Sequence, residues 1–180
     1  MNAPTSSRRP SGLPRALADL ILVVALQAVL TIAHFSYGAH RYDDPSRYHV
    51  VVPAIVAFAL MGAATAFAFF RPNRLTRWLL CAVASIPFVG MFGLYHGLVL
   101  HGAKLLWFAA GASPARLLEL FDSPDFAVPN DLLFELSGLS TFFVALAVVW
   151  SLVRLMRIAP RAGDSTEPTP ESGSDAAQPS

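Results

Sequence analysis

The chain has 180 residues, of which 54% are hydrophobic and only 14% are charged. Soluble domains carry roughly 25% charged residues, so this composition indicates that lipid is the main solvent of the folded chain. A net charge of +1 excludes the broad basic field that nucleic-acid binding needs, and a single cysteine excludes an intrachain disulfide or a cysteine-pair redox centre. The basic residues are almost all arginine, a bias typical of GC-rich bacterial genomes, which favours a bacterial inner membrane.

Both ends of the chain are predicted to be disordered. Residues 1–14 combine Pro, Ser, Gly and Arg with almost no large apolar side chain, and residues 159–180 are rich in Pro, Ser, Gly, Thr and acids. Neither segment can bury enough apolar surface to offset the entropy lost on ordering. We therefore expect one membrane domain over residues 15–158. A secretory signal peptide is rejected at the N-terminus, because the apolar run is too long and no small-residue cleavage site follows it.

Four apolar runs predict four membrane-spanning helices. They cover about residues 16–37, 50–70, 78–100 and 132–153. At 1.5 Å per residue each is long enough to cross a hydrocarbon core of about 30 Å. Small residues on two runs predict close helix packing. On the third run Gly90, Gly93 and Gly97 permit tight crossing or bending, and on the second run one face of small residues lets another helix approach. That face consists of Ala59, Gly62, Ala63 and Ala66.

The connection between the third and fourth spans contains two further helical signals. Residues 101–110 are predicted to continue the third helix. Ser113 and Pro114 form an N-cap followed by proline at the first helical position, which predicts a short helix through Phe121 on the outer membrane surface. The fold class is therefore an all-α, integral membrane four-helix bundle with an interfacial helix in the outer loop between spans three and four.

Arginine placement predicts the orientation of the bundle, because basic residues resist translocation. Nine basic residues flank one set of span ends: Arg8, Arg9, Arg15, Arg71, Arg74, Arg77, Arg154, Arg157 and Arg161. Four flank the other set: Arg41, Arg47, Lys104 and Arg116. The first set is predicted to be cytoplasmic, with both termini inside the cell.

Titratable side chains gather at the predicted outer ends of the spans. All five histidines fall there: His34, His40, His49, His96 and His101. His34, His96 and Glu135 each lie about one helical turn inside a different span, so the three side chains are expected to share one layer. Imidazole and carboxylate groups that converge within a helix bundle are typical ligands of a transition metal, and ionisable groups inside a span are candidates for function.

Two neighbours complete the candidate outer-face site. Asp131 lies four residues before Glu135 and therefore shares its helical face, although an aspartate there also caps a helix N-terminus. His101 follows His96 by five residues, roughly 140° around an α-helix, which argues against a paired-histidine motif and weakens the metal hypothesis. The structural alternative for Glu135 is an ion pair with Lys104, Arg41 or Arg47.

Three functional hypotheses follow. The leading one is a small multi-pass membrane protein, of the accessory-subunit type, with an outward-facing histidine and carboxylate cluster. The second is a redox protein that binds a transition metal at His34, His96 and Glu135, or haem between His34 and His96. The third is a small-molecule transporter, which would have to oligomerise because four helices enclose little volume. The lipid bilayer, a second membrane protein and another copy of the chain are the expected partners. No nucleophile motif favours an enzyme.

Overall fold

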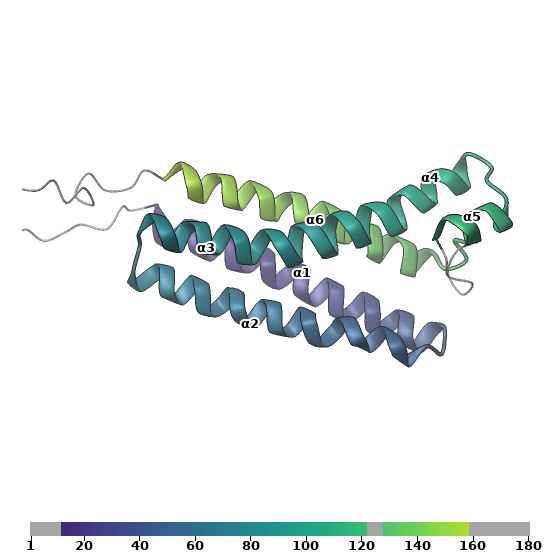
Figure 1. Cartoon of the computed structure of the whole chain (residues 1–180), viewed down its shortest axis with the longest axis horizontal. Helices are drawn as coiled ribbons and strands as arrows, with labels where there is room; N and C mark the ends of the chain where they lie inside the picture. Colours follow the sequence, from purple (N-terminus) through teal and green to yellow (C-terminus); the bar gives the residue numbers. More distant parts are fainter. Residues whose placement is uncertain (1–11, 122–127, 159–180) are drawn as a thin grey trace, which may run out of the picture.

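Four long apolar helices, each of the length and composition needed to cross a membrane, build the protein (Figure 1). The computed structural model describes residues 12–121 and 128–158, and no strand occurs within those ranges. The expected all-α fold, with four helices long and apolar enough to cross a membrane, is therefore confirmed for these residues. The predicted disordered ends lie outside the described residues, except for residues 12–14.

The helices follow the chain in an up-and-down order. They are α1 (Leu13–Arg41), the short 3₁₀ turn η1 (Pro45–Arg47), α2 (Tyr48–Phe70), α3 (Arg74–Ala84), η2 (Ser85–Ala103), α4 (Lys104–Ala109), α5 (Pro114–Phe121) and α6 (Leu132–Arg157). The segments α3, η2 and α4 form one continuous apolar rod, and this rod is the third span. Its extension through α4 agrees with the helical continuation expected for residues 101–110.

Local sequence signals explain where these helices begin. Helix α1 starts at Leu13, inside the predicted disordered lead, because Pro14 is compatible with the first helical turn, where its missing N–H is not needed. Asn73 opens α3 with a reciprocal capping box to Thr76. The backbone N–H of Arg116 donates to the Ser113 hydroxyl at the start of α5, as the predicted cap requires.

The third span departs from α-helical geometry over most of its length. Between Ser85 and Ala103 the backbone is a π-helix of 19 residues, with Pro87 near its start. Its hydrogen bonds join residues five apart, so each turn is wider than an α-helical turn. Side chains five residues apart therefore lie nearly above one another on this segment, and not on different faces.

Glycines of η2 allow it to lie directly against α6, which agrees with the tight crossing expected for this span. A Cβ atom added to Gly97 would lie 2.5 Å from Thr141 Oγ1, and one added to Gly93 would overlap Ala145. The carbonyl of Phe92 accepts a hydrogen bond of 2.8 Å from the Thr141 hydroxyl across this crossing. The contact between η2 and α6 consequently has no room for larger side chains.

The packing face expected on α2 is not the one that packs within the chain. Ala59, Ala63 and Ala66 are exposed, and a Cβ atom on Gly62 would meet nothing within 4 Å. Helix α2 instead buries the neighbouring face: Ala54, Ala57, Met61, Ala64 and Ala68. In a helix that is apolar on every side, small residues alone do not show which face meets the rest of the bundle.

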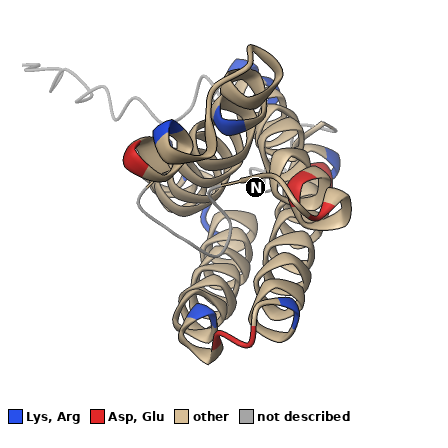
Figure 2. Cartoon of the chain, turned by 90° about the vertical axis from the view of Figure 1, so that its right-hand side faces the viewer, with Lys and Arg blue, Asp and Glu red and all other residues tan. Residues whose placement is uncertain are grey.

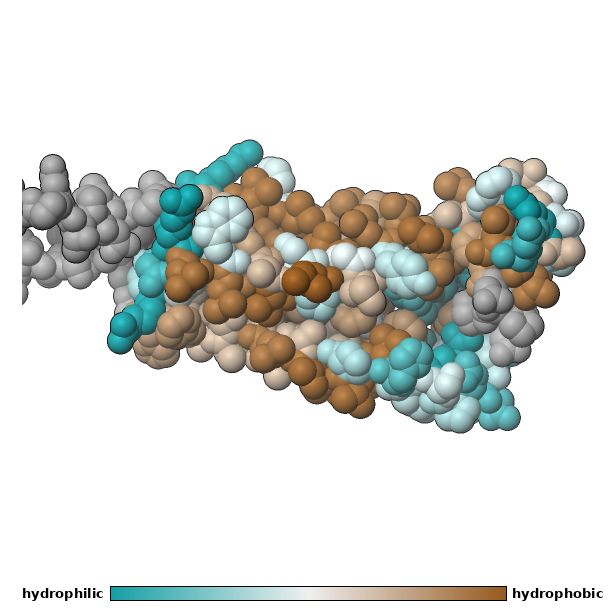
Figure 3. Space-filling model, in the orientation of Figure 1, coloured by the Kyte–Doolittle hydropathy of each residue, from teal (hydrophilic) through white to brown (hydrophobic). Residues whose placement is uncertain are grey.

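The two ends of the bundle differ in chemistry. Arg71, Arg74, Arg77, Arg154 and Arg157 lie where α2 ends, α3 begins and α6 ends, and we call this the arginine end. The opposite end, with α4, α5 and the turn between α1 and α2, is the histidine end, and Figure 2 views it along the bundle. Figure 3 shows an apolar band between hydrophilic residues at both ends, as expected of a chain that crosses lipid.

Candidate metal centre

Three histidines from two helices meet at one point inside the histidine end. His34 of α1 and His96 and His101 of η2 each place a ring nitrogen within 4.8 Å of the others, and all three side chains are buried. Their ring centroids are 4.8 to 4.9 Å apart in every pairing. We call His34, His96 and His101 the histidine cluster.

The pairing of His96 with His101 corrects the expectation drawn from the sequence. On an α-helix the two side chains would be roughly 140° apart and could not share a ligand. On the π-helix η2 a separation of five residues corresponds to about one turn, so both imidazoles reach the same point. The backbone geometry of this one segment therefore creates the cluster.

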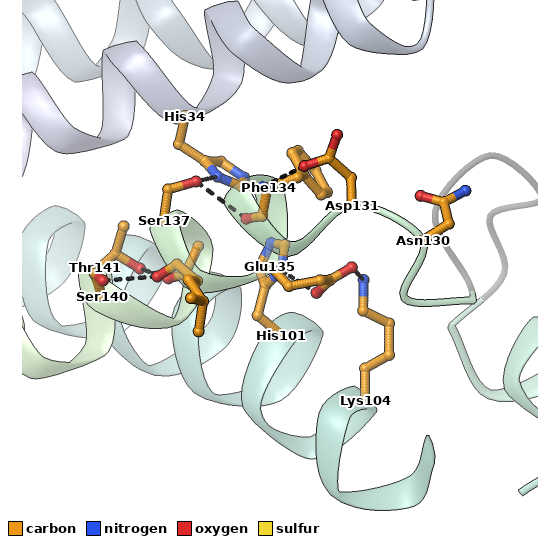
Figure 4. A network of polar contacts seen from close by, with 12 residues as sticks. His34, His101, Lys104, Asn130, Asp131, Phe134, Glu135, Ser137, Ser140 and Thr141 are labelled. Atoms are coloured by element: carbon orange, nitrogen blue, oxygen red, sulfur yellow. Dashed lines mark hydrogen bonds and ion pairs between the residues drawn. The ribbon is translucent and has the colours of Figure 1, made fainter. Parts of the chain in front are cut away.

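Hydrogen bonds around His34 define its protonation. Ser137 of α6 donates its hydroxyl hydrogen to the carbonyl of Phe134 at 3.1 Å. Its oxygen lies 2.9 Å from His34 Nδ1, and with the hydroxyl hydrogen directed at the carbonyl we assign the imidazole hydrogen to Nδ1 (Figure 4). This assignment leaves the lone pair of His34 on Nε2, which is buried and has no hydrogen-bond partner among the described residues.

A carboxylate holds His101 in the same way. Glu135 of α6 accepts a hydrogen bond of 2.8 Å from His101 Nδ1, which leaves the lone pair of this ring on Nε2. The other carboxylate oxygen accepts from Lys104 Nζ at 2.5 Å, and both members of this ion pair are almost fully buried. Glu135 thus contacts His101 and lies outside the group of three converging histidines, and its role as a metal ligand remains a prediction.

Packing fixes the positions of the imidazole rings. The Phe134 ring stacks on His34 with a centroid distance of 4.4 Å, and the Phe35 ring lies 4.5 Å from His96. His101 lies against the backbone of α6 at Gly138, where any Cβ atom would overlap the imidazole. The His96 ring also has a buried Nε2 without a hydrogen-bond partner.

A cavity of about 370 Å³ adjoins the cluster at the histidine end. His96 and His101 line it with Phe92 and Phe134, and Asp44 and Arg47, from the turn before α2, belong to its wall. Figure 1 shows that α2 and the third span diverge toward this end, where the cavity lies. A small solute could therefore reach two of the three histidines.

Asp131 has a structural role outside the cluster. It caps α6 by accepting a hydrogen bond from the backbone of Phe134, and it also accepts from Tyr37 and Arg41 at 2.9 Å each. These contacts, the backbone bond first, lower the pKa of the Asp131 carboxyl. Close by, burial raises the pKa of Tyr42 to about 12, so its phenol stays protonated and donates to Asn130.

The structure thus brings together four of the five residues proposed from the sequence and leaves Asp131 at a helix terminus. Two further residues contact the cluster or its carboxylate and were not predicted as site residues from the sequence. No sequence pattern marked Ser137, and Lys104 was considered only as an ion-pair partner of Glu135. Lys104 is the single lysine of an arginine-rich chain. A buried lysine beside a glutamate one helical turn into a span is the pattern that could have revealed it.

Comparison with known proteins gives no match for this chain. The sequence matches no protein-family model, and no curated protein or solved structure is similar to it. What the chain can do therefore has to be inferred from the histidine cluster itself.

Proposed function

We propose that this protein is a membrane protein that binds one transition-metal ion at His34, His96 and His101. The observation that carries the proposal is that three buried imidazoles place ring nitrogens within 4.8 Å of one another, and that His34 Nε2 and His96 Nε2 have no hydrogen-bond partner among the described residues. Buried nitrogen lone pairs without partners are costly, and a metal ion would satisfy them together.

The spacing of the three rings favours a single ion. Metal–nitrogen bonds of about 2.0 Å place tetrahedral ligands about 3.3 Å apart, and the cluster nitrogens lie within 4.8 Å, so small side-chain rotations would close the site. Haem between His34 and His96 fits less well. Its axial ligands stand on opposite faces of the macrocycle, whereas these rings are in edge contact at a centroid distance of 4.8 Å.

Hydrogen bonds to the second ring nitrogens add support. Metal-bound histidines usually donate their other N–H to a carboxylate, a carbonyl or a similar acceptor, which orients the ring and strengthens it as a ligand. Glu135 accepts from His101 and Ser137 accepts from His34. The cluster therefore has two of its three rings already oriented by α6.

The local charge narrows the choice of ion. Neutral imidazoles bind zinc, copper, iron and nickel. Among the described residues Glu135 is the carboxylate that contacts the cluster, and it is already paired with Lys104. A bound ion would bring its full charge into a buried site. The desolvation free energy that this costs rises steeply with the charge of the ion. Among imidazole-binding ions the site therefore favours univalent copper, Cu⁺, over divalent ions.

The proposed placement in the membrane follows from the arginine end. Basic residues remain on the cytoplasmic side of a bacterial inner membrane, so the histidine end and its cavity would face outward, with both termini inside. Helix α5 would then lie on the outer surface. Reporter fusions to the turn between α2 and α3 test this orientation, which predicts a cytoplasmic location for Arg71 and Arg74.

Metal analysis of the purified protein tests the function. After equilibration with Cu⁺ or Zn²⁺ under reducing conditions and removal of excess metal, we expect about one copper per chain and a lower zinc content. The H34A, H96A and H101A variants should lose the copper, and H40A, at an exposed histidine, should retain it. Absence of bound metal, or equal binding by the triple variant, would refute the proposal.

Accessory-subunit and transporter roles remain predictions, and crosslinking in native membranes distinguishes them. A subunit of a larger assembly should be captured with a different protein, whereas an oligomeric transporter should be captured with itself. Neither result alters the assignment of the cluster as a metal site.

A further inference from the structure

Below the histidine cluster, α1 carries a second group of buried polar side chains that the metal site does not use. Gln27 and Thr31 are completely buried, and the amide nitrogen and oxygen of Gln27 and the hydroxyl of Thr31 have no hydrogen-bond partner among the described residues. With His34 they occupy positions i, i+4 and i+7, so all three lie on one face of the helix.

These unpartnered groups require a small hydrogen-bonding partner. An unsatisfied buried polar group costs roughly 1–3 kcal/mol, and the cost is paid several times along this face. Lipid and a second protein copy are excluded as partners because neither side chain is exposed at the surface of the chain. Water is the molecule that commonly satisfies such groups, and a stable buried water needs two to four polar partners.

The two ends of this polar face have different neighbours. Toward the histidine end His34 contacts His96 and His101, and these two residues line the 370 Å³ cavity. Toward the arginine end the same face of α1 continues with Val24 and Leu20, both completely buried in the hydrophobic core. No polar side chain interrupts that part of the face between Val24 and Leu13 among its buried residues.

We propose that a column of water enters the bundle from the cavity, passes the histidine cluster and ends at Gln27, where Val24 and Leu20 close it. At 1.5 Å per residue the column extends about 10 Å from His34 to the middle of α1. It would give the buried imidazoles a route for proton exchange with the outer solution while the apolar layer keeps protons from crossing. This proposal does not depend on metal binding.

The side-chain amide of Gln27 provides a direct test. The chain has two glutamines, Gln27 and Gln178, so the Q178N variant leaves one side-chain amide signal after selective ¹⁵N-glutamine labelling. In metal-free protein in lipid vesicles, solid-state NMR should show magnetisation transfer from water to the Gln27 amide protons, and these protons should exchange in D₂O within hours. No transfer and no exchange over several days would refute the column.

Two variants test the direction of access. T31L fills the proposed column between Gln27 and the cluster and should slow the exchange of the Gln27 amide at least tenfold. V29L adds the same bulk two residues away on the lipid-exposed face of α1 and should leave the exchange unchanged. Unchanged exchange in T31L would overturn access from the histidine end. If T31L does not fold, the isosteric T31V, which removes only the hydroxyl, should still slow exchange measurably.

Discussion

His101 follows His96 by five residues, and the two imidazole rings nevertheless lie 4.8 Å apart, because the third span is π-helical between Ser85 and Ala103. Long π-helical segments are rare, and short ones occur frequently at functional sites. In this protein the wide turn places two imidazoles of the histidine cluster on one face of a single helix. The third imidazole, His34, comes from α1.

Removing the groups that orient the imidazoles should weaken metal binding without abolishing it. E135Q replaces the carboxylate that accepts from His101, and S137A removes the acceptor of His34 Nδ1. Each should raise the dissociation constant for Cu⁺ by about 10- to 100-fold, measured by competition with a chelator of known affinity. S140A is the matched control, because the Ser140 hydroxyl bonds only within α6. Equal affinities in all variants would show that these bonds do not tune the site.

The buried ion pair between Lys104 and Glu135 should be critical for stability in a way that surface pairs are not. K104M leaves the Glu135 carboxylate buried without its cation, which should cost about 3–5 kcal/mol. K104M combined with E135Q should cost less than the sum of the single variants. Reversible unfolding in mixed detergent micelles measures these values.

An exposed pair provides the control for this prediction. Arg116 and Glu119 form an ion pair on α5 with side chains that are 50% and 68% exposed. R116M should therefore change stability by less than about 1 kcal/mol. If K104M and R116M had equally small effects, the Lys104 ammonium would not be needed to hold Glu135.

Gly138 should tolerate no larger residue, because its Cα hydrogen faces the His101 ring. In G138A the new methyl group would overlap the imidazole, so His101 must move away from Glu135. Overpacking of this kind costs about 1–3 kcal/mol, and copper binding should fall together with stability. G62A adds the same methyl group where nothing lies within 4 Å and should be close to wild type in both measurements.

Acid should weaken the attachment of α6 through Asp131. Hydrogen bonds to the folded carboxylate lower its pKa below the ordinary 3.8, so they stabilise the fold above that pH and are lost as pH falls through the folded pKa. D131N cannot gain or lose this charge. The wild type should be more stable than D131N at about pH 6, and the difference in melting temperature should shrink toward about pH 2. A constant difference would contradict this role of the carboxylate.

The sequence alone determined the features that depend on composition along the chain. Four apolar runs of sufficient length predict four helices because burying a backbone in lipid requires its hydrogen bonds to be satisfied within each segment. Gly90, Gly93 and Gly97 predicted tight crossing or bending of the third span, and matched depth predicted that His34, His96 and Glu135 share one layer. These properties are local, so the length of each apolar run and the spacing of residues along it are enough to predict them.

The tertiary structure decided which of these groups lie together. On an α-helix His96 and His101 would lie on different faces, whereas the π-helical backbone places both on the same face. From the sequence alone, Arg41, Arg47 and Lys104 were all possible ion-pair partners of Glu135. The packing of the third span against α6 places Lys104 and His101 beside its carboxylate. Backbone winding and side-chain contacts between helices depend on packing across the whole bundle, so the same residues could form the site in one arrangement and lie apart in another.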